Sequence, residues 1–360
     1  MPTRNIRKDP ALRVVAIGGG TGLSTLLQGL KRYVDPERRQ LNFPEAEPNE
    51  HSLDITAVVT VTDDGGSSGR LRRDFAVLPP GDIRNCMVAL SEDEALLSRL
   101  FQYRFAAGRG LKGHSFGNLF LTAMTQLTGD FASAVKVSME ILAGAGRIYP
   151  STAENVALAA RLEDGTVVSG ETRISKSRSR IQSVVLRPRK PRPLPETLEA
   201  IAEADVITLG PGSLFTSVLP NLLVDGIAEA IRASRAIKAY FCNLMWQPGE
   251  TIQFKASDHV AAIHKHARGQ LLDAIIVNTQ PIGEALRERY ASQKALPVEV
   301  DLDRLQSMGI RVIEGNLLAQ EQKARHDPQL TAAMAVRLAR EGARQKASQA
   351  GRPHVIATGT

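Results

Sequence analysis

Residues 14–24 read VVAIGGGTGLS, an apolar run rich in β-branched residues that passes through a glycine-rich turn into an apolar helix pattern. Glycine lets the backbone turn tightly and approach a ligand closely. The first N–H groups of the following helix, which carries Leu23, Leu26, Leu27 and Leu30, would then face an anion. This strand–turn–helix unit predicts an α/β fold with a phosphate-binding loop at the carboxyl end of its first strand.

The loop matches neither of two common phosphate-binding fingerprints. In the G-x-G-x-x-G dinucleotide pattern, a start at Gly18 places Leu23 at the third glycine, and a start at Gly20 places Thr25 there. No Gly-Lys-Ser/Thr sequence follows, as a Walker A loop requires. The loop therefore predicts phosphate binding and leaves the nucleotide open, with NAD as a minor alternative.

Short β-rich runs alternate with helical periodicity along the chain. They predict strands at 14–18, 55–62, 205–209, 237–242, 274–278 and 298–301, and helices at 23–33, 92–105, 118–127, 221–234 and 259–267. This order is typical of a Rossmann-like, doubly wound, mainly parallel sheet with helices on both faces. Aromatic residues make up only 4% of the 360 residues, so we expect a core of Ala, Val, Ile and Leu.

One region departs from this alternation. An Asp-Gly turn joins apolar runs at 156–162 and 167–174, which predicts an antiparallel hairpin, and 181–186 reads as a third strand before a proline-rich connector. We interpret residues 149–195 as an antiparallel hairpin subdomain inserted in a single α/β nucleotide-binding domain that spans 12–330.

Charge and hydropathy restrict the class of protein. The net charge of +7 concentrates at 173–192 and 337–352, without the interleaved aromatic residues of single-strand nucleic-acid binders, so an anionic nucleotide ligand is the expected partner rather than nucleic acid. No apolar run is long enough to cross a membrane, and no secretory signal pattern is present, so we expect no membrane insertion and a cytoplasmic location. Residues 34–53 predict an exposed loop or lid, and residues 342–360 a flexible basic tail.

Four further loops place glycine and polar residues where predicted strands end or helices begin. They are 61–73 (VTDDGGSSGRLRR), 78–85 (LPPGDIRN), 112–119 (KGHSFGNL) and 209–217 (LGPGSLFTS). A tight or capped turn would explain any one of them. Together with the first loop, they are most simply explained by one anion-binding crevice at the strand ends.

The second of the five loops carries two adjacent carboxylates, Asp63 and Asp64, at the end of a strand. Either could hold a ribose hydroxyl or ligate Mg²⁺ through oxygen. Residues 65–69 could form a backbone nest for phosphate, with Arg70 as its charge partner. In the fourth loop, His114 could contact phosphate or transfer a proton, although a histidine in such a turn more often makes a local hydrogen bond.

The loops in this order, with CNLM at 242–245, PGET at 248–251 and SDH at 257–259, resemble the gluconeogenesis factor (YvcK-like) family. This family lies within the 2-phospho-L-lactate transferase (CofD-like) superfamily. The resemblance implies a Rossmann-like core that binds a UDP-sugar, notably UDP-N-acetylglucosamine. It also implies a regulatory role in cell shape and peptidoglycan precursor supply on gluconeogenic carbon sources. A partner protein related to the cell wall and a homodimer stay open.

Two site residues enter only through this resemblance. The family ties a tyrosine in a YAxxxAxPV segment and an arginine in an RHxP-like segment to sugar-nucleotide binding; these match Tyr290 in YASQKALPV and Arg325 in RHDP. Tyr290 could stack on a uracil or sugar face, and Arg325 could pair with a diphosphate. The residues expected to bind the nucleotide or its phosphates are Gly19, Gly20, Thr21, Gly22, Asp63, Asp64, Gly65, Ser67, Ser68, Asp82, Asn85, His114, Asn118, Gly210, Gly212, Ser213, Tyr290 and Arg325. Asp63 and Asp64 are also the candidate Mg²⁺ ligands.

The transferase branch of the superfamily, which moves a 2-phospho-lactyl group to a deazaflavin with Mg²⁺, is the alternative. This chain shares GGTG at 19–22 and the two aspartates at 63–64 with that branch. It has Ser24 where the transferases resemble one another in having a lysine, and PPGDIRN at 79–85 replaces a Ser-Pro-Asp-type segment. These differences favour a binding protein, and we assign no catalytic residue.

Overall fold

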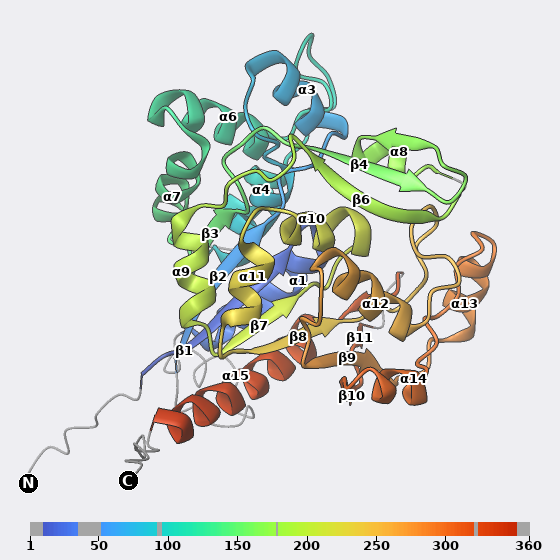
Figure 1. The fold of residues 1–360 in the computed structure, drawn as a ribbon. Coiled ribbons are helices and arrows are strands. Elements are labelled where there is room, and N and C mark those ends of the chain that lie inside the picture. The colour runs from blue at the N-terminus through green and yellow to red at the C-terminus, as the bar shows by residue number, and fades with distance from the viewer. Residues whose placement is uncertain (1–9, 35–51, 92–95, 178, 320–322, 351–360) are drawn as a thin grey trace, which may run out of the picture.

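A computed structural model describes residues 10–34, 52–91, 96–177, 179–319 and 323–350 (Figure 1). Its centre is a seven-stranded sheet in the order β10-β9-β8-β7-β1-β2-β3, in which every pairing is parallel. The strands are β1 (Leu12–Gly18), β2 (Leu53–Val59), β3 (Arg147–Pro150), β7 (Val206–Leu209), β8 (Ile237–Phe241), β9 (Ala274–Asn278) and β10 (Arg311–Gly315). The predicted α/β class with a mainly parallel sheet is confirmed.

The strand order reverses direction beside β1. From β1 the chain adds β2 and β3 on one side, and then adds β7, β8, β9 and β10 on the other. Strands β1 and β7 are direct neighbours, with Val14 opposite Val206 and Ile17 opposite Leu209. The first and fifth glycine loops, which follow these two strands, therefore begin side by side at the point where open α/β sheets bind their ligands.

Helices flank the sheet. They are α1 (Gly20–Leu30), α3 (Gly66–Phe75), α4 (Gly81–Leu90), α5 (Leu96–Gln102), α6 (Phe116–Thr128), α7 (Phe131–Ile141), α9 (Pro195–Glu203), α10 (Leu219–Leu222), α11 (Ile227–Ala233), α12 (Ala256–His266), α13 (Glu284–Ala291), α14 (Leu302–Ser307) and α15 (Pro328–Ala350), with the short helices η1 (Lys31–Tyr33) and η2 (Leu214–Val218). Helix α1 packs against both α4 and α15. A Cβ at Gly29 would lie 1.8 Å from the carbonyl oxygen of Pro328, so only glycine permits this approach.

The antiparallel subdomain is present with different bounds. Strands β4 (Ala157–Leu162), β5 (Val167–Ser169) and β6 (Ile181–Arg187) form a separate sheet, drawn in light green in Figure 1. The expected start at 149 is wrong, because β3 pairs with β2 of the central sheet. The strand expected at 167–174 ends at Ser169, because Gly170 adopts a φ of +96° and the chain enters the short helix α8 (Glu171–Ile174).

The strand predicted at 298–301 is also wrong. The N–H of Val298 donates to the carbonyl of Leu244, and the carbonyl of Glu299 accepts from the N–H of Ala256, so this segment pairs with loops instead of a neighbouring strand. The last strand of the sheet is β10, which the sequence patterns did not predict.

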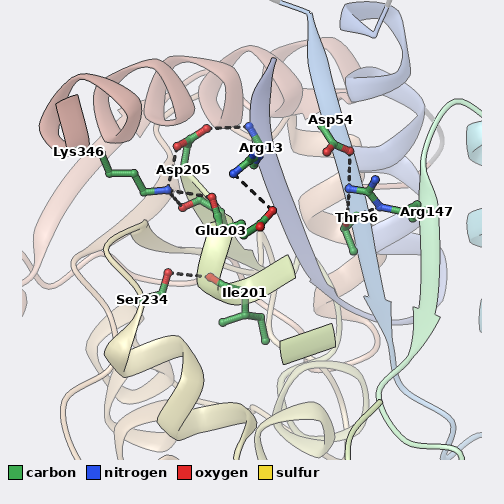
Figure 2. A network of polar contacts seen from close by, with 10 residues as sticks. Arg13, Asp54, Thr56, Arg147, Ile201, Glu203, Asp205, Ser234 and Lys346 are labelled. Atoms are coloured by element: carbon green, nitrogen blue, oxygen red, sulfur yellow. Dashed lines mark hydrogen bonds and ion pairs between the residues drawn. The ribbon is translucent and has the colours of Figure 1, made fainter. Parts of the chain in front are cut away.

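The carboxyl-terminal boundary lies beyond the expected one. Helix α15 continues to Ala350, so residues 342–350 are helical rather than a flexible tail, and buried residues of its first half belong to the main core. Near its end, Lys346 donates to Oδ1 of Asp205 at 2.9 Å and to the carbonyl of Glu203 (Figure 2). Residues 351–360 and most of the expected lid, residues 35–51, lie outside the described residues.

Among the helices that the structure describes, none is by itself long and apolar enough to span a membrane. One bent pair of helical segments, Leu214–Leu222 and Ile227–Ala233, reaches the length and apolar composition of a membrane span only when the two are taken together.

Candidate functional site

A cleft of about 440 Å³ opens where the strand order reverses. It is lined by residues 19–22, 211–213, 243–248 and 324–326, together with Thr25, Glu171, Ser217 and Tyr290. A larger cavity of about 680 Å³ lies between the start of β1 and the end of α15. Ligands of open α/β sheets bind at the carboxyl ends of the strands, so the smaller cleft is the candidate site.

The first and fifth loops pack backbone to backbone at this cleft. A Cβ at Gly22 would lie 2.4 Å from the carbonyl oxygen of Pro211 and 2.8 Å from the amide nitrogen of Gly212. Gly20 and Gly210 adopt φ values of +63° and +73°, a region that disfavours residues with a side chain. Glycine at these positions therefore lets the two loops meet and form one wall of the cleft.

The amino end of α1 faces the cleft with little capping. Gly19 occupies the N-cap position, where it offers no side chain, and the first turn holds no acidic residue. The carboxylate of Asp82 accepts a hydrogen bond from the N–H of Gly20. The next N–H groups of the first turn, together with the helix dipole, favour an anion at this end of the cleft.

Tyr290 and Arg325 lie far along the chain from the glycine loops, yet both line this cleft. Arg325 belongs to a short antiparallel ribbon of β11 (Leu318–Ala319) and β12 (Arg325–His326). The hydroxyl of Tyr290 accepts a hydrogen bond from the N–H of Ala324 at 3.3 Å, which links the tyrosine to that ribbon. The structure thus brings together Gly19, Gly20, Thr21, Gly22, Gly212, Ser213, Tyr290 and Arg325 of the expected residues.

Three buried atoms of residues that line the cleft have no hydrogen-bond partner within the described part of the chain. They are Oε1 of Gln247, Nε2 of His326 and Oε2 of Glu171. Nε2 of Gln247 donates to Oγ of Ser213 at 2.9 Å, which leaves its oxygen as an acceptor. Burial lowers the pKa of His326 to about 4, and its ring bonds the backbone of Cys242, so its free nitrogen is also an acceptor. Buried polar groups usually have partners, so the two free acceptors on Gln247 and His326 indicate a ligand with hydrogen-bond donors.

Sequence reasoning did not select Gln247, His326 or Glu171 as site residues. His326 follows Arg325 in the RHDP segment, which was the available signal. Glu171 reaches the cleft from α8 of the antiparallel subdomain, and no local motif marks it.

The expected carboxylates border the cleft without lining it. The amide of Gly65 donates to Oδ1 of Asp63 at 2.8 Å, and the hydroxyl of Thr172 donates to Oδ1 of Asp64 at 2.8 Å. In the described ranges, no group of three or more His, Cys, Asp and Glu side chains is arranged to hold a metal ion. Asp63 and Asp64 therefore do not form a complete metal site by themselves.

Two further carboxyl groups near Asp63, those of Asp82 and Glu171, have raised proton affinity. Burial, and then the charge of Asp63, raises the pKa of Asp82 to about 7. Burial, and then the charges of Asp82 and Asp63, raises the pKa of Glu171 to about 9. Glu171 is therefore protonated at neutral pH and can donate a hydrogen bond into the cleft.

We expect stability to depend on pH through Glu171. The folded protein keeps this proton up to about pH 9, whereas the unfolded chain loses it near pH 4.5. The free energy of unfolding should therefore fall as pH rises through this window, by up to ~1.4 kcal/mol per pH unit. Glu171→Gln, which mimics the protonated form, should flatten this fall in the free energy of unfolding. The difference should be clearest between pH 7 and 9, because the raised pKa of Asp82, about 7, makes Asp82 contribute to the pH dependence mainly below pH 7.

Urea unfolding between pH 5 and 9 measures this dependence. Glu163→Gln, at an exposed turn, is the matched control and should leave the profile unchanged. An unaltered slope in the Glu171 variant would contradict the assignment of a buried proton to this side chain.

The fourth loop lies behind the carboxylates and does not line the cleft. Ser67 and His114 form a hydrogen bond of 2.9 Å between Oγ and Nδ1, and burial lowers the pKa of His114. Arg84 donates to Oδ1 of Asn118 at 3.2 Å and to Oδ1 of Asn85 at 2.6 Å. Of the five predicted loops, the first and the fifth thus line the cleft, and the other three lie beside it. Of the expected residues, Asp63, Asp64, Gly65, Ser67, Ser68, Asp82, Asn85, His114, Asn118 and Gly210 do not line the cleft.

Comparison with known proteins identifies the family. The family model for 2-phospho-L-lactate transferase CofD matches residues 14–318. The chain belongs to the CofD family. It is 49% identical over 315 residues to the gluconeogenesis factor of Halalkalibacterium halodurans, which covers 87% of this chain and 92% of that protein. It is 45% identical over 330 residues to the gluconeogenesis factor of Bacillus subtilis, which covers 91% and 98% of the two chains.

These similarities place the chain in the gluconeogenesis factor branch of the CofD-like superfamily, as the motifs predicted. A solved structure supports the same conclusion. The crystal structure of a protein from Bacillus halodurans superposes with a TM-score of 0.83 at 46% identity, covering 91% of this chain and 99% of that one. The CofD-like fold is therefore shared over nearly the whole described chain.

Proposed function

We propose that this protein binds a UDP-sugar, UDP-N-acetylglucosamine in particular, in the cleft between the first and fifth loops. On this proposal it is a cytoplasmic regulatory protein that supports cell shape and peptidoglycan precursor supply on gluconeogenic carbon sources. One observation carries the proposal. Tyr290 and Arg325, for which the family resemblance implies a role in sugar-nucleotide binding, line the same cleft as the glycine loops.

The chemistry of the cleft suits the two halves of such a ligand. A diphosphate would lie between the amino end of α1 and the guanidinium of Arg325, both of which favour anions. The ring of Tyr290 offers an apolar face for a sugar or uracil. The free acceptors on Gln247 and His326 would receive hydrogen bonds from sugar hydroxyl or amide N–H groups. The volume of about 440 Å³ is in the range of small-molecule sites.

The test is the thermal midpoint with and without UDP-N-acetylglucosamine. Ligand at about 100 times its Kd should add ~2.7 kcal/mol of stability and raise the midpoint by several degrees. Arg325→Ala should abolish this rise, because it removes the cation that faces the diphosphate. Arg304→Ala, which breaks an exposed ion pair with Asp258 away from the cleft, is the matched control and should keep the rise. No rise at millimolar ligand in the unsubstituted protein would refute the proposal.

Transfer of a 2-phospho-lactyl group to a deazaflavin with Mg²⁺ is the second candidate function. The match to the family model named for this transferase favours it, as do the carboxylates beside the cleft. Two carboxylates can bind Mg²⁺ when substrate phosphates and water complete the coordination. A mass-spectrometric assay for the transferred product, lost in Asp64→Ala, would support transfer; absence of product with Mg²⁺ present would count against it.

A further inference from the structure

A second cavity, of about 570 Å³, adjoins the cleft along α1. Its walls come from α1, α4, α5 and the residues that follow α5. Thr21, Thr25 and Arg325 line both this cavity and the cleft between the first and fifth loops, which we call the nucleotide cleft. The two spaces are therefore neighbours that share one cation at their boundary.

The second cavity is strongly basic. Lys31, Arg84, Arg104 and Arg325 line it, and no acidic side chain is among the described residues that do so. Its other polar lining consists of hydroxyl and amide side chains, which can donate to an anion as well. The nucleotide cleft differs, because Glu171 forms part of its lining.

Arg84 is held in place at this cavity. Its guanidinium donates to Oγ of Ser115 at 2.5 Å and to the side-chain oxygens of Asn118 and Asn85. Its Nε is buried and has no hydrogen-bond partner within the described residues. Burial, and then the charge of Arg104, lowers the pKa of Arg84. A buried donor without a partner and two neighbouring guanidinium groups are both relieved by a bound anion.

We propose that this cavity binds a small phosphomonoester as a second ligand beside the nucleotide cleft. Guanidinium groups hold phosphate oxygens through paired, charge-assisted hydrogen bonds, and Arg84 and Arg104 are placed to supply them. The volume exceeds the needs of an inorganic ion and suits a phosphorylated metabolite. Because Arg325 lines both cavities, a ligand bound in one of them can change the affinity of the other for its ligand. This second site goes beyond the UDP-sugar proposal and does not depend on it.

Isothermal titration calorimetry on the full chain tests the site, with glucose 6-phosphate as the probe and glucose and inorganic phosphate as comparisons. Glucose 6-phosphate should bind at one equivalent, more tightly than inorganic phosphate, while glucose should not bind. Arg104→Ala, at an exposed position, should weaken binding at least ~10-fold, as should Arg84→Gln. Arg99→Ala, which removes a nearby cation on α5 that does not line the cavity, should leave the affinity unchanged.

The same titration in saturating UDP-N-acetylglucosamine separates the two proposals. Continued binding of glucose 6-phosphate supports a second site, whereas its complete exclusion means that one ligand occupies both cavities and overturns it. Absence of binding, equal binding of inorganic phosphate, or unchanged affinity in both Arg84→Gln and Arg104→Ala also overturns it. If UDP-N-acetylglucosamine does not bind but glucose 6-phosphate binding depends on Arg104, only the UDP-sugar proposal fails.

Discussion

Replacing Gly22 by alanine is expected to weaken nucleotide binding at least ~100-fold, the equivalent of about 2.7 kcal/mol. The added Cβ would lie 2.4 Å from the carbonyl oxygen of Pro211, a distance that real contacts do not reach. Both partners are backbone, in α1 and in the loop after β7, so neither can move aside as a flexible side chain would. The first and fifth loops must separate, and the amino end of α1 leaves its place in the cleft.

Calorimetric titration of UDP-N-acetylglucosamine and urea unfolding measure the two effects of Gly22→Ala. We expect the free energy of unfolding to fall by about 1–3 kcal/mol, as in other overpacked sites. Gly283→Ala is the matched control, because a Cβ there would meet no other part of the described chain within 4 Å and the φ of Gly283 is −57°. Gly283 is the N-cap residue of α13, where alanine is less favourable than glycine, so this variant should cost no more than about 1 kcal/mol and should leave binding intact. Normal affinity in Gly22→Ala would show that the contact between the loops does not shape the site.

The parts of this molecule that were predictable from the sequence are those with local causes. The strand–glycine–helix units at the first and fifth loops each combine an apolar strand, a turn that needs glycine and a helical segment, which is amphipathic after the first loop and fully buried after the fifth. Their adjacency then follows from the pairing of β1 with β7. Local patterns also predicted the antiparallel strands β4 and β6 within a few residues.

The parts that escaped prediction depend on distant contacts. Residues 298–301 have strand-like composition, but their backbone partners are the loop at Leu244 and the start of α12. Glu171 carries no motif, and only the packing of α8 beside Asp64 and Asp82 brings it to the cleft and keeps it protonated. The free acceptors on Gln247 and His326 are visible only when the hydrogen bonds of the folded chain are known.

The end of α15 also escaped prediction because it depends on a distant contact. Its basic, polar sequence predicted a flexible tail. A Cβ at Gly342 would lie 2.0 Å from the carbonyl oxygen of Asp205, so the helix approaches the start of β7 closely. Four residues later, Lys346 reaches the Asp205 carboxylate (Figure 2). Gly342 lies inside the helix and permits this close contact with the strand.

Asp205→Ala is expected to lower the free energy of unfolding by about 2–4 kcal/mol, the largest effect on stability that we expect from a polar residue. Oδ2 of Asp205 accepts the backbone N–H of Arg13 at 2.8 Å, and Oδ1 accepts Nζ of Lys346 at 2.9 Å (Figure 2). The Asp205 side chain is only 12% exposed and that of Lys346 23%, so water replaces the lost carboxylate poorly. Alanine therefore leaves the N–H of Arg13 without this acceptor, and it leaves the ammonium group of Lys346 with backbone carbonyls but no counter-charge.

Urea unfolding of a matched set separates these contributions. Asp205→Asn keeps an acceptor for the N–H of Arg13 but removes the charge. Its free energy of unfolding should therefore fall, but by less than that of Asp205→Ala. Asp225→Ala breaks an ion pair with Lys190 at 4.0 Å, whose side chains are 56% and 69% exposed, and should cost less than about 0.5 kcal/mol. If Asp205→Ala costs no more than Asp225→Ala, the carboxylate does not fix α15 to the sheet. If Asp205→Ala lowers the free energy of unfolding and Asp205→Asn does not, the stabilisation comes from the hydrogen bond donated by the N–H of Arg13 in β1 rather than from Lys346.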